Sequence, residues 1–279
     1  MLSISRTIPF LRNAVTDARS RGQRIALVPT MGALHEGHLS LCRLAAQHAP
    51  FVVVSIFVNP AQFAPHEDLA TYPRDEAGDI AKLETVDAVQ LIYVPTPSVM
   101  YPDGFATSVV PKGAAEGLET DFRPHFFAGV ATVVTKLFTQ VAPDVAVFGE
   151  KDYQQLQVIK QLVRDLDLPI EIIGGETLRE PDGLALSSRN AYLDARARAI
   201  AGRLNVIMRS TAGSVAQGRD VGLCVKIGHD ELRKAGFEVD YLEIRDASTL
   251  KPVTDRTKPM RILAAVRIGR TRLIDNMPV

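Results

Sequence analysis

Two histidines three residues apart, His35 and His38, are the side chains best placed for chemistry in this chain. They lie between an apolar run, Ile25 to Val28, and a second apolar-patterned stretch that begins at Leu39. This order predicts a buried strand, a turn containing Gly and Pro, and then the N-terminus of a helix. A helix N-terminus presents free N–H groups and a partial positive charge, so it can bind phosphate, and two imidazoles there would add donors. The stretch therefore predicts a nucleotide site.

Two other interpretations of this pair stay open at the level of sequence. The histidines could be hydrogen-bonded turn residues with a structural role, or they could bind a metal. The metal interpretation is disfavoured, because the spacing is not the i, i+4 spacing of a zinc-protease helix and no cysteine lies nearby. The strand–turn–helix context favours a catalytic role.

A second candidate is Lys151, which follows the apolar run Val145 to Phe148 in the stretch Gly149 to Asp152. A lysine after a strand is often a solvated turn residue, so Lys151 alone would carry little weight. Asp152 and Gln155 have the spacing of a capping box, which predicts a structural role at the start of a helix. Both could also contact a ligand at the same edge of the sheet.

Polar residues also follow two other predicted breaks. Gln62 follows the apolar run Phe51 to Val58, and its amide could donate to and accept from hydroxyls or a carboxylate. Ser187, Ser188 and Arg189 follow Gly183, a possible hinge, and their groups suit phosphate oxygens. A loop glutamine without a function would give the same pattern as Gln62, and a serine-rich connector would give the same pattern as residues 187–189. The stretch Arg123 to His125 could hold an anion, but we expect it to be a surface loop.

The elements that must position these residues alternate between strands and helices up to about residue 180, which predicts βαβ units and a parallel sheet. Strands are expected at 25–28, 51–58, 88–94, 145–148 and 170–173, with a short one at 106–110, and helices within 1–23 and at about 39–45, 74–84, 129–141 and 156–166. The chain then changes character. Two helical stretches in 194–235, broken around 218–220, precede closely spaced strands at 238–244, 261–268 and 272–275. We therefore predict an α/β fold with a Rossmann-like nucleotide-binding domain (1–183) and a smaller α+β lid domain (184–279).

Composition limits the classes of function. Lys plus Arg equal Asp plus Glu at 32 each, so no net positive charge attracts nucleic acid. Cys42 and Cys224 are far apart, which argues against a disulfide framework and suits a reducing compartment. No signal peptide and no apolar run near 18 residues is visible. We expect a cytoplasmic protein without nucleic-acid or membrane partners.

Several stretches together closely resemble the pantoate–β-alanine ligase family (pantothenate synthetases), part of the nucleotidyltransferase superfamily that carries the HxGH signature. The matching stretches are VPTMGALHEGHLSL, VVVSIFVNPAQF, DLATYPR, FGEKDYQQL, DGLALSSRNAYL and RLIDN. Their order covers nearly the whole chain. HxGH alone indicates only the superfamily, which includes class I aminoacyl-tRNA synthetases, whereas the other stretches are specific to the ligase.

The resemblance implies an activity in the pathway to coenzyme A. The family uses ATP and Mg²⁺ to convert pantoate into pantoyl adenylate, and β-alanine then displaces AMP to give pantothenate. It also implies a homodimer. It leaves the Mg²⁺ ligands unidentified.

The resemblance also assigns roles to residues of this chain. His38, His35 and Lys151 would be catalytic, with His38 in the proton-donor role. Gln62 and Gln155 would hold pantoate, and Gln62 would also lie near β-alanine. ATP would contact Met31, Gly32, Ala33, Leu34, His35, Glu36, Gly37, His38, Gly149, Glu150, Lys151 (phosphate), Asp152 (ribose), Leu178 (adenine side), and Leu186, Ser187, Ser188 and Arg189, which would close over the phosphates.

One segment departs from the family pattern. Many relatives have a histidine directly before the Phe of R-P-x-H-F-x-G-V, whereas this chain has Phe126 at that position and His125 one residue earlier. No role is therefore assigned to His125. The alternatives are an adenylyltransferase for a phosphate-bearing acceptor, a tRNA-charging enzyme, and a catalytically silent nucleotide-binding module. The adenylyltransferase would need more basic side chains to bind its acceptor. The tRNA-charging enzyme would need a basic RNA-binding module. The intact set of candidate residues disfavours the silent module.

Overall fold

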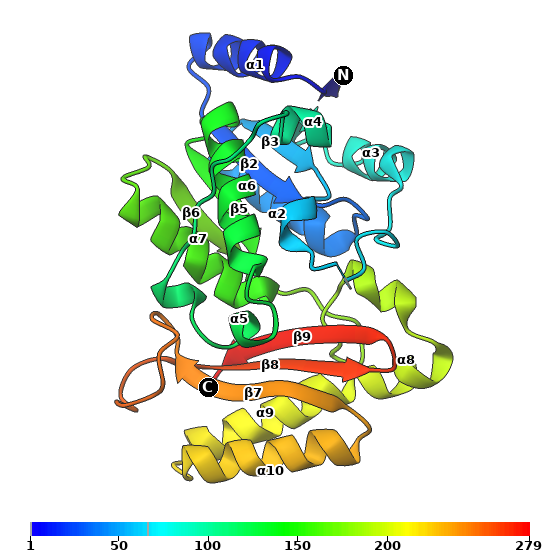
Figure 1. Ribbon diagram of the computed structural model, residues 1–279, viewed down its shortest axis with the longest axis vertical. Coiled ribbons are helices and arrows are strands. Elements are labelled where there is room, and N and C mark those ends of the chain that lie inside the picture. The colour runs from blue at the N-terminus through cyan, green and yellow to red at the C-terminus, as the bar shows by residue number, and fades with distance from the viewer. Residues whose placement is uncertain (1, 66) are drawn as a thin grey trace.

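The computed structural model describes residues 2–65 and 67–279 and contains two separate sheets (Figure 1). The larger sheet is parallel, in the order β1-β4-β3-β2-β5-β6. Its strands are β1 (Ser3–Ser5), β2 (Ile25–Thr30), β3 (Phe51–Ile56), β4 (Val89–Tyr93), β5 (Val145–Gly149) and β6 (Glu171–Gly175). The smaller sheet is antiparallel and consists of β7 (Glu238–Asp246), β8 (Met260–Ile268) and β9 (Thr271–Pro278). The predicted fold class is confirmed.

The helices connect and cover these strands. The α-helices are α1 (Ile8–Ser20), α2 (Glu36–His48), α3 (Glu76–Glu84), α4 (Pro97–Met100), α5 (Glu119–Phe122), α6 (Phe126–Val141), α7 (Tyr153–Asp165), α8 (Ala195–Ala201), α9 (Arg203–Ala216) and α10 (Val221–Lys234). Short 3-10 helices are η1 (Pro60–Gln62), η2 (Gly113–Ala115), η3 (Glu150–Asp152) and η4 (Ser188–Tyr192). Within the described ranges, no helix is both long enough and apolar enough to span a membrane.

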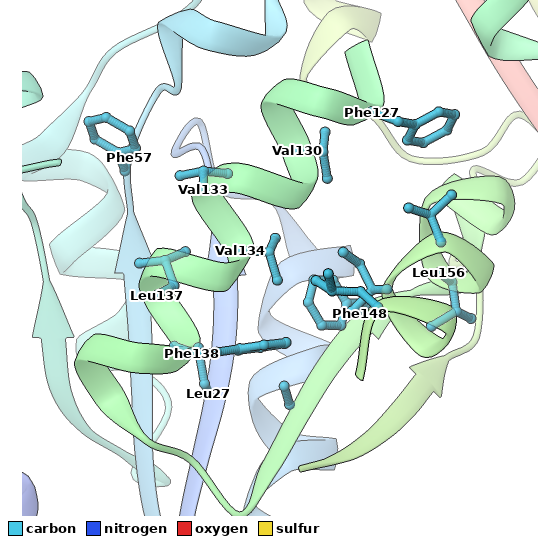
Figure 2. Packing of buried hydrophobic residues seen from close by; sticks show 14 of the residues in the cluster. Leu27, Phe57, Phe127, Val130, Val133, Val134, Leu137, Phe138, Phe148 and Leu156 are labelled. Atoms are coloured by element: carbon cyan, nitrogen blue, oxygen red, sulfur yellow. The ribbon is translucent and has the colours of Figure 1, made fainter. Parts of the chain in front are cut away.

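The central strands read as continuous apolar runs because both faces of the parallel sheet are covered. In β2, Ile25 and Leu27 belong to the core that α1, α6 and α7 share, whereas Ala26 and Val28 belong to the core on the α2 side. Figure 2 shows helix α6 lying across the first of these cores, with its valine and phenylalanine side chains beside Phe148 of β5. This packing fixes the position and direction of β2 and β5.

The order of the strands creates a crevice between β2 and β5. Strand β2 pairs with β3 on one side and β5 on the other, with Val28 opposite Val54 and Leu27 opposite Ala146. The chain therefore leaves β2 and β5 in opposite directions across the sheet. Ligands bind at such switch points, beyond the carboxyl ends of the strands. The segments that follow β2 and β5 are those that contain the predicted site residues.

The small sheet closes the other side of this crevice. Helices α9 and α10 cover the face of the sheet that is turned away from the parallel sheet (Figure 1). Ile262 and Ala264 of β8 pack in that core, whereas Leu263 and Ala265 pack in the core that also contains β2 and α6. The apolar residues of the small sheet thus join the core of the parallel sheet to the core that α9 and α10 cover.

The structure differs from the predicted elements at four places. Residues 106–110 form no strand; Val109 donates its N–H to the Thr132 hydroxyl of α6 at 2.9 Å, so the segment packs on a helix without a strand partner. The neighbouring residues, for which no helix was predicted, include α4 and α5. Strand β1 precedes the predicted first helix, since three residues are too few to give a periodic pattern. The first of the two helices predicted within 194–235 is split into α8 and α9 at Gly202, whose backbone lies against Asp182.

Candidate functional site

A cavity of about 800 Å³ lies at the carboxyl ends of β2, β3 and β5, between the parallel sheet and the small sheet. Three segments form much of its wall: the histidine turn (Met31–His38) after β2, the lysine loop (Gly149–Asp152) after β5, and the closing segment (Leu186–Arg189). The predicted site residues on its lining are Met31, His35, Gly37, His38, Gln62, Gly149, Lys151, Asp152, Gln155, Leu178, Leu186, Ser187, Ser188 and Arg189. The structure therefore brings together most of the residues that sequence singled out.

The histidine turn is held by hydrogen bonds to its backbone. Gly32 and Ala33 have left-handed φ values of 83° and 51°, and the Gly32 N–H donates to the Thr30 hydroxyl at 3.3 Å. The buried Asp79 carboxylate of α3 accepts the N–H groups of Ala33 and Leu34 at 2.8 and 2.7 Å. These two amides are thus already bonded. Direct nucleotide contacts of Gly32, Ala33 and Leu34 stay predictions.

The two imidazoles form the capping box at the start of α2. The Nδ1 atom of His38 accepts the His35 N–H, and the Nδ1 atom of His35 accepts the Gly37 N–H, both at 3.2 Å. The ring centroids are 4.1 Å apart. Because both Nδ1 atoms act as acceptors, the proton of each neutral ring must be on Nε2. The structural and catalytic interpretations of this pair are therefore compatible.

Burial and nearby positive charge keep both rings neutral. The pKa of His35 falls to about 4, first because the ring is buried and then because Lys151 and Lys82 lie close. The pKa of His38 falls to about 3 through burial, His35 and the same lysines. At neutral pH each ring is therefore a neutral Nε2–H donor. Glu36, between them, turns to the surface and pairs with Arg43.

The lysine loop forms η3 and enters α7 directly. The predicted capping box of Asp152 and Gln155 was wrong, since Asp152 makes no side-chain hydrogen bond to the start of α7. Its φ and ψ of −93° and 58° are not the extended values of most capping residues. Asp152 instead lies on the cavity wall, close enough to His35 to oppose the lowering of that ring's pKa. Glu150 pairs with Arg261 of β8 at 3.0 Å.

The two glutamines lie on different elements of the cavity wall. Gln62 is buried at the end of η1, where its amide N–H contacts the Met31 sulfur at 2.9 Å and its carbonyl accepts from Asn59 at 3.1 Å. Gln155 lies in the first turn of α7. The sequence had not singled out Asn59, which also donates to the Gly129 carbonyl and so ties η1 to α6.

The closing segment already contacts the opposite wall. The Ser188 hydroxyl donates to the Ala33 carbonyl at 3.1 Å. The Arg189 guanidinium makes two hydrogen bonds, of 3.0 and 2.9 Å, to the Asp68 carboxylate, and lies 5.5 Å from the centre of the Tyr72 ring. Asp68 and Tyr72 belong to the stretch DLATYPR, which the resemblance had marked without assigning a role.

The segment Arg123 to His125 is a turn with Pro124 exposed, as expected for a surface loop, but Arg123 packs inward. Arg123 is largely buried on the cavity wall, where it pairs with Glu67 and with Glu119, and its guanidinium stacks on the Phe126 ring at 3.9 Å. His125 lies 3.9 Å from Glu67 and precedes α6. The unusual Phe126 therefore acts as a surface on which Arg123 packs.

A parallel sheet with neutral donors and a lysine converging at its switch point indicates an α/β enzyme that binds a ligand there and stabilises negative charge on it. Comparison with known proteins identifies the family. The family model for pantoate–β-alanine ligase matches residues 3–278, and the chain belongs to this family.

Individual relatives agree over almost the whole length. The chain is 54% identical over 278 residues to a pantothenate synthetase of Bradyrhizobium sp., covering 99% of this chain and 98% of that one. Its fold matches the crystal structure of pantothenate synthetase from Thermus thermophilus with a TM-score of 0.93 and 44% identity, each chain being 99% covered. It also matches a pantoate–β-alanine ligase from Francisella tularensis complexed with β-γ ATP and β-alanine (TM-score 0.83, 36% identity, 100% and 98% covered). The expected enzyme family is thus confirmed.

Proposed function

We propose that the protein condenses (R)-pantoate with β-alanine, using ATP, through a pantoyl-adenylate intermediate. The observation that carries this proposal is the convergence of two neutral Nε2–H imidazoles, Lys151 and the closing segment on one cavity. That cavity lies at the switch point of the parallel sheet, where open α/β sheets generally bind their ligands, and this position supports a nucleotide site. The Francisella relative, complexed with β-γ ATP and β-alanine, supports the choice of substrates.

In the first step the pantoate carboxylate attacks the α-phosphorus of ATP, and pyrophosphate leaves. Such a step needs alignment and neutralisation of charge more than covalent help from protein. Lys151 would neutralise the phosphate chain. His35 and His38 would donate hydrogen bonds from Nε2. With a pKa of about 3, His38 is suited to donate a hydrogen bond rather than to transfer a proton.

In the second step the β-alanine nitrogen attacks the carbonyl carbon of the mixed anhydride. The C–O bond to AMP breaks, the amide forms, and the amine loses a proton. Gln62 and Gln155 would orient pantoate through its hydroxyl and carboxylate groups, because an amide both donates and accepts. Gln62 would also lie beside the incoming amine.

The remaining assignments follow the same geometry. Ser187, Ser188 and Arg189 would cover the phosphates, and Leu178 would lie on the adenine side. Because the Ser188 hydroxyl already contacts the histidine turn, the segment is placed to exclude water from the reactive anhydride.

We also propose that Mg²⁺ accompanies ATP. Mg²⁺ usually keeps several waters and binds through substrate phosphates with one or two carboxylates. Asp152 fits this donor set, since its carboxylate lies on the cavity wall and does not cap α7. The ion would supply charge neutralisation at the phosphates, and Asp152 would also lie near the ribose.

Three further features are proposals about the whole protein. The division into 1–183 and 184–279 is supported by a hydrophobic core whose members all lie between Leu184 and Val279. A cytoplasmic location is supported by the two buried free thiols of Cys42 and Cys224. A homodimer is implied by the resemblance alone, and the molar mass in solution tests it.

The experiment that tests the function is incubation with ATP, pantoate and β-alanine, omitting each in turn. We expect pyrophosphate release to require pantoate but not β-alanine, and AMP release to require all three. Pyrophosphate release that ignores pantoate, or that needs a phosphate-bearing acceptor instead, would contradict the proposal.

A further inference from the structure

Two adjacent residues of β9, Asp275 and Asn276, each contact a different wall of the cavity. Both are almost completely buried, with 3% of each residue exposed. Successive side chains of a strand point to opposite faces, so this dipeptide reaches in two directions at once. It belongs to the stretch RLIDN, to which the sequence gave no role.

Asn276 holds the backbone of the lysine loop. Its amide nitrogen donates to the carbonyl oxygens of Glu150 and Lys151, at 2.9 and 2.8 Å. Its carbonyl oxygen accepts from Arg261 Nε at 2.6 Å. Both amide hydrogens and the oxygen are therefore used, and the orientation of the side chain is fixed. Arg261 is in turn held by the Glu150 carboxylate and by the Tyr153 ring, 3.7 Å below it.

Asp275 holds the hairpin that leads to the closing segment. Its carboxylate accepts two hydrogen bonds from Arg179, at 2.7 and 2.9 Å, and one from its neighbour's N–H at 2.7 Å. Arg179 also donates to the Gly183 carbonyl at 3.0 Å and pairs across the hairpin with Ala185. The next residue pair, Leu178 and Leu186, is bonded through the backbone at 2.9 Å.

The contacts of Asp275 and Asn276 thus link the lysine loop and the closing segment through consecutive residues of one strand. Two phosphate-binding segments from different parts of the chain must lie at a fixed separation to contact one triphosphate, because a displacement of about 1 Å can reduce the rate by about 10²-fold.

We propose that Asp275 and Asn276 are positioning residues, which set the separation between Lys151 and the closing segment for adenylate formation. This inference rests on the proposed function. Neither side chain needs to touch substrate; each acts through the backbone that it holds.

The two half-reactions separate this role from a purely structural one. Lys151 acts on the phosphates in our proposal, and pyrophosphate has left before β-alanine attacks. A displaced lysine loop should therefore slow adenylate formation much more than the reaction of isolated pantoyl adenylate with β-alanine, in which the ribose contact proposed for Asp152 is the contact of this loop that remains. A general loss of structure would slow both.

The test measures both half-reactions, ATP binding and thermal unfolding for Asn276→Asp, Asn276→Ala and Asp275→Asn. Asn276→Asp is nearly isosteric and keeps the acceptor for Arg261, but it places an oxygen against two carbonyl oxygens. For Asn276→Asp we expect adenylate formation to fall about 10- to 100-fold, and the second half-reaction, measured with saturating pantoyl adenylate, to change less than about twofold. Arg261→Lys, which removes the orienting Nε contact, provides a milder variant if the others fold poorly.

Two controls complete the test. Val266→Ala alters a fully buried residue of β8 in the core of the small sheet, so it should lower stability without changing the ratio of the half-reactions. In the Lys151→Ala background, Asn276→Asp should have little further effect on adenylate formation, since both changes act through Lys151. Equal slowing of both half-reactions, or additive effects in the double variant, would overturn the proposal. If the wild-type protein itself releases no pyrophosphate with pantoate, the proposed function has failed and not this inference.

Discussion

At the scale of single residues, the candidate site consists of neutral and positive donors arranged around one cavity. Lys151 shares the cavity wall with both histidines, and its charge lowers the pKa of both rings. Because these rings are neutral, we expect Lys151 to supply the formal positive charge and the imidazoles to supply directed hydrogen bonds, whereas the charge of Arg189 is paired with Asp68. This division of roles leads to two predictions.

The first prediction concerns the size of these contributions. Lys151→Ala, and likewise His38→Ala, should reduce adenylate formation by about 10²–10³-fold, the loss typical of one transition-state donor. Pyrophosphate release in single turnover, together with thermal unfolding, measures it. Lys160→Ala is the matched control, because Lys160 is exposed on α7. A loss of thermal stability that accounts for the loss of activity would favour a structural role.

The second prediction concerns the protonation of the histidine pair. Histidine NMR spectra should show His35 and His38 as Nε2–H tautomers that do not titrate between pH 5 and 8, since their pKa values are about 4 and about 3. Both values lie below that of an unfolded histidine, about 6.5, so the unfolded state binds protons first on acidification. The pair should therefore destabilise the fold progressively below about pH 6.5 and have no effect above it. Titration of either ring near pH 6.5 would contradict this assignment.

At the scale of elements, the histidine turn depends on α3 as much as on its own strand and helix. Asp79 accepts two backbone N–H groups of the turn, and Lys82 of the same helix donates to the Leu34 carbonyl at 2.9 Å. These contacts hold Ala33 in its left-handed conformation, which is unfavourable for a residue with a side chain. Helix α3 is thus part of the candidate site, although none of its residues was predicted to bind a substrate.

Asp79→Asn should destabilise the protein by about 1–3 kcal/mol and weaken ATP binding. The asparagine amide would keep one acceptor and turn an N–H₂ group towards a backbone N–H, which leaves a buried donor unpaired. Chemical unfolding and ATP titration measure the two effects. Glu84→Gln, at the exposed end of the same helix, is the control. Unchanged ATP affinity would show that the turn keeps its shape without Asp79.

The elements also show what sequence can and cannot predict here. The strand–turn–helix unit around His35 was predictable because its apolar periodicity, Gly and Pro are local signals. The contact between Asp79 and Ala33 joins residues 46 positions apart and leaves no local pattern. The prediction of a capping box at Asp152 was wrong for a related reason. Asp and Gln are residue types that form such a cap, but the chain enters α7 through η3. Similarly, β1 is recognisable only from its partner β4.

At the scale of the whole molecule, the cavity exists only where the two halves of the chain meet. Glu119 of α5 accepts from Arg272 of β9 at 2.7 Å and from Arg123 at 3.1 Å. Arg272 also donates to Asp240 of β7 at 2.7 Å. This chain of alternating charges crosses from the first half of the protein to the small sheet. It complements the contacts of Asp275 and Asn276 on the same strand.

Glu119→Gln should therefore loosen the junction between the halves. Burial raises the pKa of Glu119, but Arg272 and Arg123 outweigh it, so the net pKa is lowered and the group is ionised at neutral pH. Removing its charge leaves two partly buried guanidinium groups without their shared partner, for which we expect a loss of about 3 kcal/mol. Glu116→Gln, exposed and three residues earlier, is the control.

The pH dependence of this loss tests its cause. A carboxylate with a lowered native pKa stabilises the fold above its unfolded pKa, and that stabilisation disappears as pH falls through the native value. The difference in unfolding free energy between the wild type and Glu119→Gln should therefore be greatest near neutral pH. It should begin to shrink below about pH 4.5, where the carboxyl group of the unfolded chain binds a proton, and should disappear at lower pH once native Glu119 is protonated. Denaturant unfolding at several pH values measures it. A difference that stays constant down to low pH would mean that the substitution acts through packing and not through the charge that spans the two halves.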